Sequence, residues 1–245
     1  MTESTQDEKN TAHKNMLQDV QTRVWSSLKS GYKYNGTADH SEEYLGSRVS
    51  QRLDLNIMYV DLVGSTLMSL EISQEKFVTI ISSFAHEMAH VVQMRNGYVL
   101  KFVGDAVLAY FPNNTDSADG ANNALNCAIT MIETITQGMN PILNQYDYPD
   151  LKIKIGIDAG QVVTISYGSE DGNFPIDLIG PPMNIAAKIQ SLAKPNQILV
   201  GYDVYKKLQL EKQSQFKAIE LSSSVWRYHS RVTGDMYGVY EYQPT

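Results

Sequence analysis

Cysteine is almost missing from this chain: the 245 residues include only Cys127, on an apolar helical stripe that favours a buried thiol over a nucleophile. A disulfide framework within the chain is therefore excluded, and a reducing compartment is expected. The absence of an apolar run of about 18 residues and of a signal-peptide core predicts no membrane span and a cytoplasmic location. Basic residues are also few, 20 Lys and Arg against 27 Asp and Glu, and the net charge of −7 argues against nonspecific nucleic-acid binding.

The remaining composition indicates one folded domain with an extra segment at its N-terminal end. Hydrophobic residues make up 42% of the chain, enough for a core of ordinary size. Residues 1–13 are polar and predicted to fray, and a short amphipathic helix is predicted from about Lys14. Residues 30–43 are predicted to form a loop. We therefore expect an N-terminal polar segment over residues 1–50 and a folded domain over residues 51–245.

Apolar periodicity and turn residues predict an alternation of strands and helices after residue 50. The expected elements are a strand at 57–60, a helix at about 74–95, a hairpin that turns at Gly104-Asp105, a helix at about 116–137, a strand pair that turns at Ala159-Gly160, a helix at about 183–193, a strand at 197–200, a short helix at 202–208 and one or two terminal strands. This order predicts an α+β fold with helices on one face of a sheet.

The stretch AHEMAHVV contains a complete H-E-x-x-H motif, from His86 to His90. On a helix this motif is typical of zinc hydrolases, in which both histidines bind the metal and the glutamate acts as the base. The apolar residues of the helix lie almost opposite both histidines, and Gln93 replaces the glycine of the longer metalloprotease motif. A zinc site also needs a third ligand. The other histidines are distant in sequence, at His13, His40 and His229. We expect His86 and His90 to face solvent or a partner subunit.

Two aspartates are better candidates for a metal site. Asp61 follows a short apolar strand, and Asp105 lies at the tip of the predicted hairpin. Gly64 and Gly104 lie close to them and allow a ligand to approach the backbone. Two converging carboxylates repel each other unless a cation lies between them, and oxygen ligands of this kind suit Mg²⁺ or Mn²⁺ with a phosphate substrate. The alternative is that Asp61 caps a helix and Asp105 is an ordinary turn residue.

Four stretches resemble, in order and with the expected separations, the signature motifs of class III nucleotidyl cyclases, the adenylate and guanylate cyclase catalytic domains. They are MYVDLVGSTLMS, GYVLKFVGDAVLAYF, IKIGIDAGQV and DLIGPPMNIAAKIQSLAKPNQILV, and the resemblance covers roughly residues 54–201. It implies a ferredoxin-like, palm-type βαββαβ core in a stand-alone catalytic domain. It also implies a head-to-tail homodimer whose active sites are shared between the subunits.

The resemblance implies a role for each matching residue. The metal residues are Asp61, Asp105 and the backbone carbonyl of Leu62, with two Mg²⁺ or Mn²⁺ ions per site. The triphosphate loop is formed by Gly64, Ser65 and Thr66. Lys101 and Asp177 read the base, and Asn184 positions the ribose. The metal aspartates come from one subunit, and the base and ribose residues from the other. The implied reaction is attack of the ribose 3′-oxygen on the α-phosphorus with loss of pyrophosphate, assisted by two metals.

Two positions depart from the family pattern. The arginine that stabilises the transition state is replaced by Lys188, which keeps the charge but lacks the planar fork that grips two phosphate oxygens. The usual lysine for the terminal phosphates has no counterpart near the C-terminus, where Arg227 and Arg231 are the candidates. Each of these three residues is alternatively an ordinary surface residue. A domain that has lost turnover and only binds nucleotide is therefore a further hypothesis.

The base specificity follows from hydrogen-bonding chemistry. Lys101 donates and Asp177 accepts, which matches the ring acceptor and neighbouring amino group of adenine and also those of cytosine. Some small members of the superfamily make cyclic CMP or cyclic UMP as antiviral signals. Tyr59 replaces a commoner phenylalanine and either packs in the core or touches the nucleotide. This reasoning ranks ATP first as substrate, pyrimidine triphosphates second and GTP third.

Overall fold

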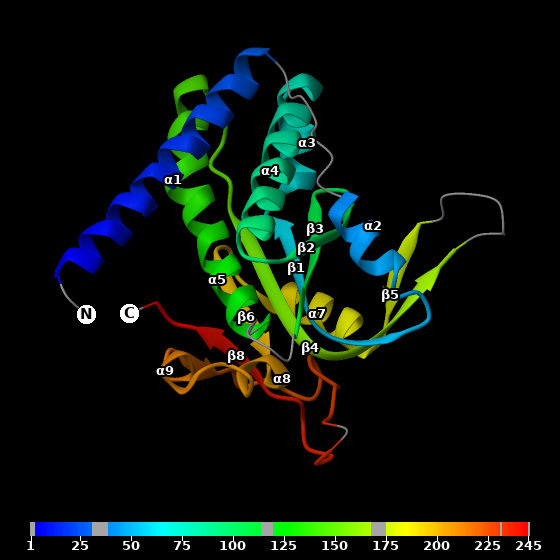
Figure 1. Ribbon diagram of the computed structural model, residues 1–245. Helices are drawn as coiled ribbons and strands as arrows, with labels where there is room; N and C mark the ends of the chain where they lie inside the picture. The colour runs from blue at the N-terminus through cyan, green and yellow to red at the C-terminus, as the bar shows by residue number, and fades with distance from the viewer. Residues whose placement is uncertain (1–2, 31–38, 114–119, 168–174, 231, 245) are drawn as a thin grey trace.

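The protein is described by a computed structural model that covers residues 3–30, 39–113, 120–167, 175–230 and 232–244, with side chains of residues 3–10 and 30 left aside. Its centre is an eight-stranded sheet within these residues, with the order β2-β3-β1-β4-β6-β8-β7 and with β5 paired to β4 (Figure 1). The strands are β1 (Arg52–Leu62), β2 (Tyr98–Val103), β3 (Ala106–Pro112), β4 (Ile153–Ser166), β5 (Ile176–Ile179), β6 (Gln197–Gly201), β7 (Phe216–Ala218) and β8 (Val239–Tyr242). β4 and β6 are parallel, and the other pairs are antiparallel.

The helices follow the predicted order after residue 50. They are α1 (Glu3–Ser30), α2 (Asp39–Gly46), α3 (Ser65–Glu71), α4 (Gln74–Met94), α5 (Gly120–Glu133), a π-helical turn at Thr134–Met139, α6 (Asn140–Leu143), a 3-10 turn at Asn144–Tyr146, α7 (Pro181–Leu192), α8 (Tyr202–Tyr205) and α9 (Leu210–Gln213). The mixed α+β fold that the sequence predicts is thus confirmed. Among the described helices, none has the length and apolar character that crossing a membrane requires.

Helices cover both faces of the sheet, so the prediction of helices on one face is wrong. Met58 and Val60 of β1 point into a core shared with α4 and α5, whereas Leu55 and Ile57 point into a second core shared with α2 and α7. The continuous apolar run of β1 is the sequence signal for this arrangement, because a strand buried on both sides does not alternate. α7 lies so close to β4 that a Cβ atom at Gly156 would stand 2.2 Å from the backbone nitrogen of Gln190.

The predicted turn at Ala159-Gly160 is also wrong, because β4 runs through both residues without interruption. β4 pairs with the whole of β1, from Arg52 opposite Val163 to Leu62 opposite Ile153. A long partner strand supplies hydrogen bonds along the full length of β4, and this outweighs the local turn preference of a glycine. The hairpin turn predicted at Gly104-Asp105 is confirmed by the pairing of β2 with β3.

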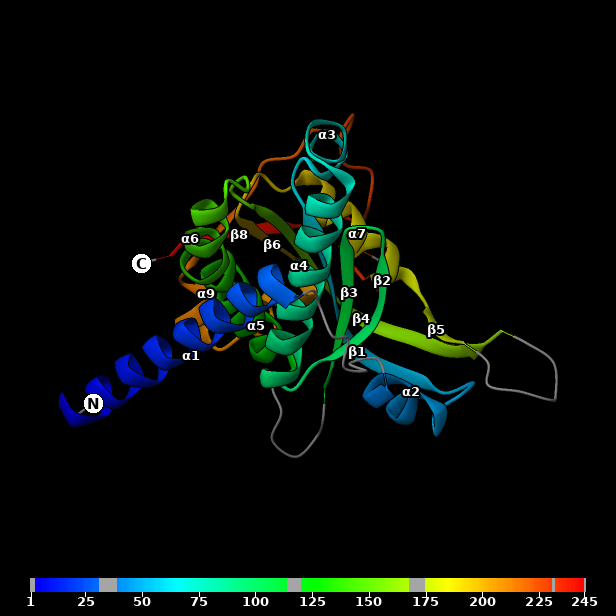
Figure 2. The same ribbon diagram turned by 90° about the horizontal axis from the view of Figure 1, so that it is seen from above.

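The N-terminal segment is more ordered than its polar sequence predicts. α1 begins at Glu3 instead of near Lys14, and its N-terminal end extends beyond the body of the protein (Figures 1 and 2). Val20 and Val24 of α1 are buried in the core beside α4 and α5. α2 overlaps the end of the predicted loop at residues 30–43, and its Leu45 is buried in the second core. Tertiary packing of a few apolar side chains therefore overrides weak local propensity in both helices.

Candidate active site

β1 and the β2–β3 hairpin bring the two predicted metal aspartates together. Met58, Val60 and Leu62 alternate into the first core, so Asp61 lies on the opposite face of β1. Asp61 pairs with Ala106, which places Asp105, the preceding residue in the hairpin turn, beside it.

The electrostatics at Asp61 are those of an anionic site, and no ion pair to Asp61 forms among the residues that the structure describes. Burial and the nearby carboxylate of Asp105 raise the pKa of Asp61, while a hydrogen bond from Gln190 and the charge of Lys154 oppose this rise. The Gln190 amide nitrogen donates to Asp61 Oδ2 at 3.1 Å. A divalent cation would remove the repulsion between the two carboxylates.

The donor set fits magnesium or manganese better than zinc. It consists of the carboxylates of Asp61 and Asp105 and the backbone carbonyl of Leu62, whose side chain is buried. Oxygen ligands that leave positions open for water and phosphate are typical of Mg²⁺. Among the described residues, no three His, Cys, Asp or Glu side chains gather as a metal site would require. A site of two carboxylates completed by substrate is consistent with that finding.

The predicted triphosphate loop is the start of α3. Gly64 has a left-handed backbone with φ 75°, which glycine adopts without strain, and a Cβ atom there would meet nothing within 4 Å. The Met68 N–H donates to the Gly64 carbonyl at 2.9 Å, so the chain enters the helix directly after Gly64. The N–H groups of Ser65 and Thr66 lie in the first turn, where no carbonyl of the helix accepts from them. They remain available to an acceptor near Asp61.

The two predicted base-reading residues meet in space although 76 residues separate them in sequence. Lys101 is on β2 and Asp177 is on β5, and the Lys101 Nζ donates to Asp177 Oδ2 at 2.5 Å. Asp177 Oδ1 also accepts from the backbone N–H of Leu178 at 2.9 Å. Tyr59 packs against the second core, and burial, followed by the charge of Asp177, raises the pKa of its hydroxyl.

α7 presents the two remaining polar residues of the predicted site on one exposed face. Asn184 and Lys188 are four residues apart and both exposed, whereas Met183, Ala186 and Ile189 bury the other side of the helix. Arg227 is exposed beside the buried Trp226 in the segment between β7 and β8. Arg231 lies outside the described residues.

These features coincide with those of one protein family. The model of the adenylate and guanylate cyclase catalytic domain matches residues 49–225, which is well over half of the chain. The chain belongs to this family. The cyclase resemblance seen in the sequence motifs is thereby confirmed.

The cyclase domain has several characterised relatives. It is 28% identical over 172 residues to a protein named cytidylate cyclase from Staphylococcus aureus. The aligned region covers 69% of this chain and 40% of the relative. A cytidylate cyclase from Escherichia coli is 29% identical, with 60% of this chain and 34% of the relative covered. Adenylate cyclase 1 from Rhizobium meliloti is 24% identical, with 62% and 22% covered. The chain therefore matches less than half the length of each of these relatives.

Solved structures confirm the fold of the cyclase domain. The adenylyl cyclase CyaB from P. aeruginosa has a TM-score of 0.65 and 22% identity, covering 80% of this chain and 96% of that structure. The guanylyl cyclase Cya2 has a TM-score of 0.66 and 21% identity, covering 79% and 93%.

The H-E-x-x-H motif of this cyclase domain is part of a helix–helix contact, so its histidines face solvent only in part, and their contact with a partner subunit stays a prediction. Glu87 is 1% exposed and accepts hydrogen bonds from Arg23 of α1 at 2.8 and 2.7 Å. His86 and His90 are only partly exposed beside this ion pair. Burial and the charge of Arg23 lower the pKa of His90. The motif is perfect in sequence, but its glutamate holds α1 against α4.

Sequence reasoning missed Gln190, the residue that contacts Asp61. Gln190 follows the buried Ala186 by four residues, so helical periodicity places it on the inner face of α7. No local pattern connects it with a strand 129 residues earlier. A cavity of about 1000 Å³ beside α2 is lined by none of the predicted site residues.

Proposed function

We propose that this cyclase domain converts a nucleoside triphosphate into the 3′,5′-cyclic monophosphate and pyrophosphate. The observation that carries the proposal is the pairing of Asp61 with Ala106, which brings the carboxylate of Asp105 next to that of Asp61. Among the described residues, the side-chain hydrogen bond to Asp61 comes from the Gln190 amide. In the reaction, the ribose 3′-oxygen bonds to the α-phosphorus and loses its proton to water. The bond from the α-phosphorus to the bridging oxygen of pyrophosphate breaks.

The residues divide into metal, phosphate and ribose groups. Asp61, Asp105 and the Leu62 carbonyl would hold Mg²⁺ or Mn²⁺, which when bound supply positive charge to the attacking and leaving oxygens. The backbone N–H groups at the start of α3 orient the triphosphate. Asn184 orients the ribose, and Lys188 neutralises charge at the α-phosphate. Arg227 and Arg231 stay candidates for the terminal phosphates, since no contact assigns either of them.

We further propose that two copies of the chain share each site, as the family resemblance implies. The exposure of Asn184 and Lys188 on α7 supports this, since a partner subunit is then free to approach them. Mixing inactive Asp61→Ala and Lys101→Ala variants tests the arrangement. Each heterodimer has one intact composite site, so random mixing is expected to restore about a quarter of the wild-type activity. Heterodimers that form without any rescue would place the complete site within one subunit.

We propose CTP as the preferred substrate, with ATP as the second candidate. The Lys101–Asp177 pair fits both cytosine and adenine. The sequence alone ranks ATP first, and the cytidylate cyclases among the relatives, 28% and 29% identical, are the reason for the reversed order.

An equimolar mixture of the four nucleoside triphosphates with Mn²⁺ tests both parts of the proposal. Mass spectrometry of the products is expected to find cyclic CMP as the main product, and none with an Asp61→Asn variant purified in the same way. A dominant cyclic AMP signal would favour the second candidate. If no cyclic nucleotide formed from any substrate, the chain would be a nucleotide-binding module instead of an enzyme.

A further inference from the structure

α2 lies outside the family match at residues 49–225, yet it contacts both strands that carry the base-reading pair. It packs beside β2, which carries Lys101, and beside β5, which carries Asp177 (Figure 1). α2 therefore belongs structurally to the half of the site that recognises the base.

Three contacts hold α2 in this position. Leu45 is 1% exposed in the second core. The buried Ser41 hydroxyl lies 3.1 Å from the hydroxyl of Tyr110 on β3, within hydrogen-bond distance. The ring of Tyr44 packs against that of Tyr98 with centroids 4.6 Å apart. A short helix that is anchored at successive turns keeps its exposed side chains at defined positions on the sheet.

A cavity of about 180 Å³ lies between α2 and the base-reading pair. Its α2 wall is formed by Ser41, Glu42 and Leu45, and Lys101 and Asp177 line the same cavity. Cavities for drug-sized ligands measure roughly 300–1,000 Å³, so this one suits a single small ring system and not a whole nucleotide. Its size, its apolar side chains and the few charged groups at its wall fit the base of the proposed substrate.

We propose that Glu42 is a specificity-determining residue, which selects a base that carries an amino group next to the ring acceptor. This inference rests on the proposed function and deepens it. Asp177 already accepts hydrogen bonds from Lys101 and from the Leu178 N–H. Glu42 is exposed on the opposite wall and brings a second carboxylate to the cavity.

The selection follows from the hydrogen-bonding capacity of an ionised carboxylate. It accepts hydrogen bonds and donates none. Glu42 therefore stabilises the amino group of cytosine or adenine and repels the carbonyl oxygen that uracil or guanine presents at the same place. A glutamine at this position would donate to that carbonyl and remove the discrimination.

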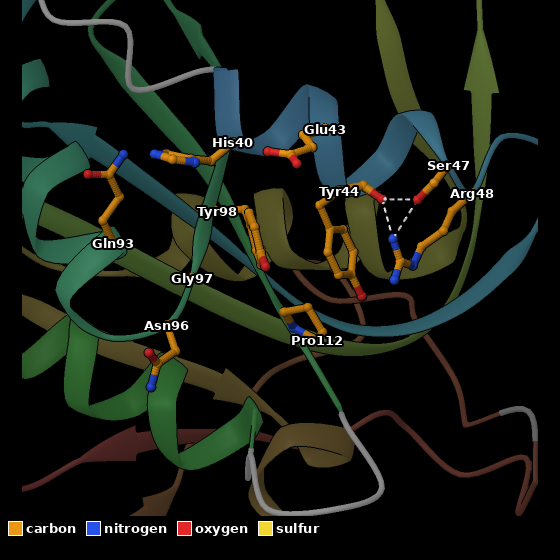
Figure 3. Close-up of a pocket in the computed structure, with 10 residues that line it drawn as sticks. All are labelled: His40, Glu43, Tyr44, Ser47, Arg48, Gln93, Asn96, Gly97, Tyr98 and Pro112. Atoms are coloured by element: carbon orange, nitrogen blue, oxygen red, sulfur yellow. Dashed lines mark hydrogen bonds between the residues drawn. The ribbon is translucent and has the colours of Figure 1, made fainter.

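Glu43 offers a matched control on the same helix. It is exposed like Glu42, but it lines the separate cavity of about 1000 Å³ together with His40, Tyr44 and Tyr98 (Figure 3). Glu42→Gln and Glu43→Gln thus make the same change in charge and size on one helix but in different cavities.

The test measures kcat/KM of the full chain for CTP and for UTP in the wild type and both variants. Glu42→Gln is expected to lower the ratio of CTP to UTP about tenfold, the loss typical of one charged hydrogen bond. Glu43→Gln is expected to leave the ratio unchanged, and thermal unfolding checks that both variants fold. If the substrate mixture identifies ATP, the same ratio is measured between ATP and GTP. An unchanged ratio in Glu42→Gln, or an equal change in Glu43→Gln, would overturn the proposal.

Measuring nucleotide binding instead of turnover tests the role of Glu42 independently of the proposed reaction. Calorimetry with the α,β-methylene analogues of CTP and UTP, whose α–β bridge resists cleavage, reports base selection without turnover. A preference for the CTP analogue that Glu42→Gln removes would support the role of Glu42 even in a protein that forms no cyclic product. If neither analogue binds, or if the preference survives the substitution, the assignment of Glu42 is wrong whatever the chain catalyses.

Discussion

Glu87 on α4 and Asp61 on β1 are both carboxylates withdrawn from water, but their surroundings are opposite. Burial alone would raise the pKa of Glu87, yet hydrogen bonds from Arg23 and His86 lower it. Burial and Asp105 raise the pKa of Asp61, whose side-chain donor within the described residues is the neutral Gln190 amide. The fold therefore neutralises one carboxylate internally, whereas the other is the carboxylate that we propose binds a cation.

The presence or absence of a charged hydrogen-bond partner distinguishes a structural carboxylate from a candidate metal ligand. It does so better than the H-E-x-x-H motif or the cyclase motifs. A carboxylate with a bidentate arginine partner already has its charge balanced and gains little from binding a metal. Two unneutralised carboxylates at a strand end and a hairpin turn form a site that a divalent ion stabilises. Three variants test the contrast, and we take them from the largest expected effect to the smallest.

Removing the charge of Asp61 is expected to have the largest effect. Asp61→Asn keeps the size of the side chain and its contact with Gln190, but weakens metal binding. We expect the rate of cyclic nucleotide formation to fall about a thousandfold, in line with the several kcal/mol that a catalytic metal contributes. Thermal stability is expected to stay equal or to rise, because the repulsion with Asp105 is lost. A variant that retains full activity would contradict the metal assignment.

Removing the partner of Glu87 is expected to affect stability instead of chemistry. Arg23→Met leaves a buried carboxylate unpaired and is expected to lower the free energy of unfolding by about 3 kcal/mol. Lys14→Met, which removes an exposed cation from the same helix, is the control and is expected to change it by less than about 0.5 kcal/mol. Urea unfolding measures both. Equal effects of the two substitutions would show that the ion pair does not hold α1.

Asp158 on β4 extends the comparison to a buried carboxylate whose side-chain partner is a hydroxyl. Tyr237 donates to Asp158 Oδ1 at 2.6 Å, and burial raises the pKa of Asp158 to about 7. The folded state thus binds a proton that the unfolded state releases near pH 4. The resulting stabilisation is complete below about pH 4 and is lost as the pH rises towards 7.

The corresponding experiment compares urea unfolding of the wild type and Asp158→Asn at several pH values. Between pH 6 and 8 the wild type is expected to lose roughly 1 kcal/mol relative to the variant, which has no proton to release. A difference between the two proteins that does not change with pH would show that Asp158 does not titrate in this range.

Much of the fold and half of the site follow from local patterns in the sequence. The boundaries of α4 and the turn at Gly104-Asp105 agree with prediction, because apolar periodicity and turn residues act over a few positions. The cyclase motifs also identified Asp61 and Asp105, whose proximity the pairing of β1 with β3 bears out. The roles of the other motif residues in substrate binding stay predictions.

What the sequence by itself determined is the α+β fold class, which short-range hydrophobic and turn patterns encode, and the candidate residues, which the resemblance of four motifs to the cyclase family implies. Only the tertiary structure decided which partner each carboxylate has. Arg23 and Glu87 lie 64 residues apart, and Gln190 and Asp61 lie 129 apart. Such contacts depend on how α1 packs on α4 and how α7 packs on the sheet. Whether a buried carboxylate is neutralised or left for a metal is therefore a property of packing between distant elements.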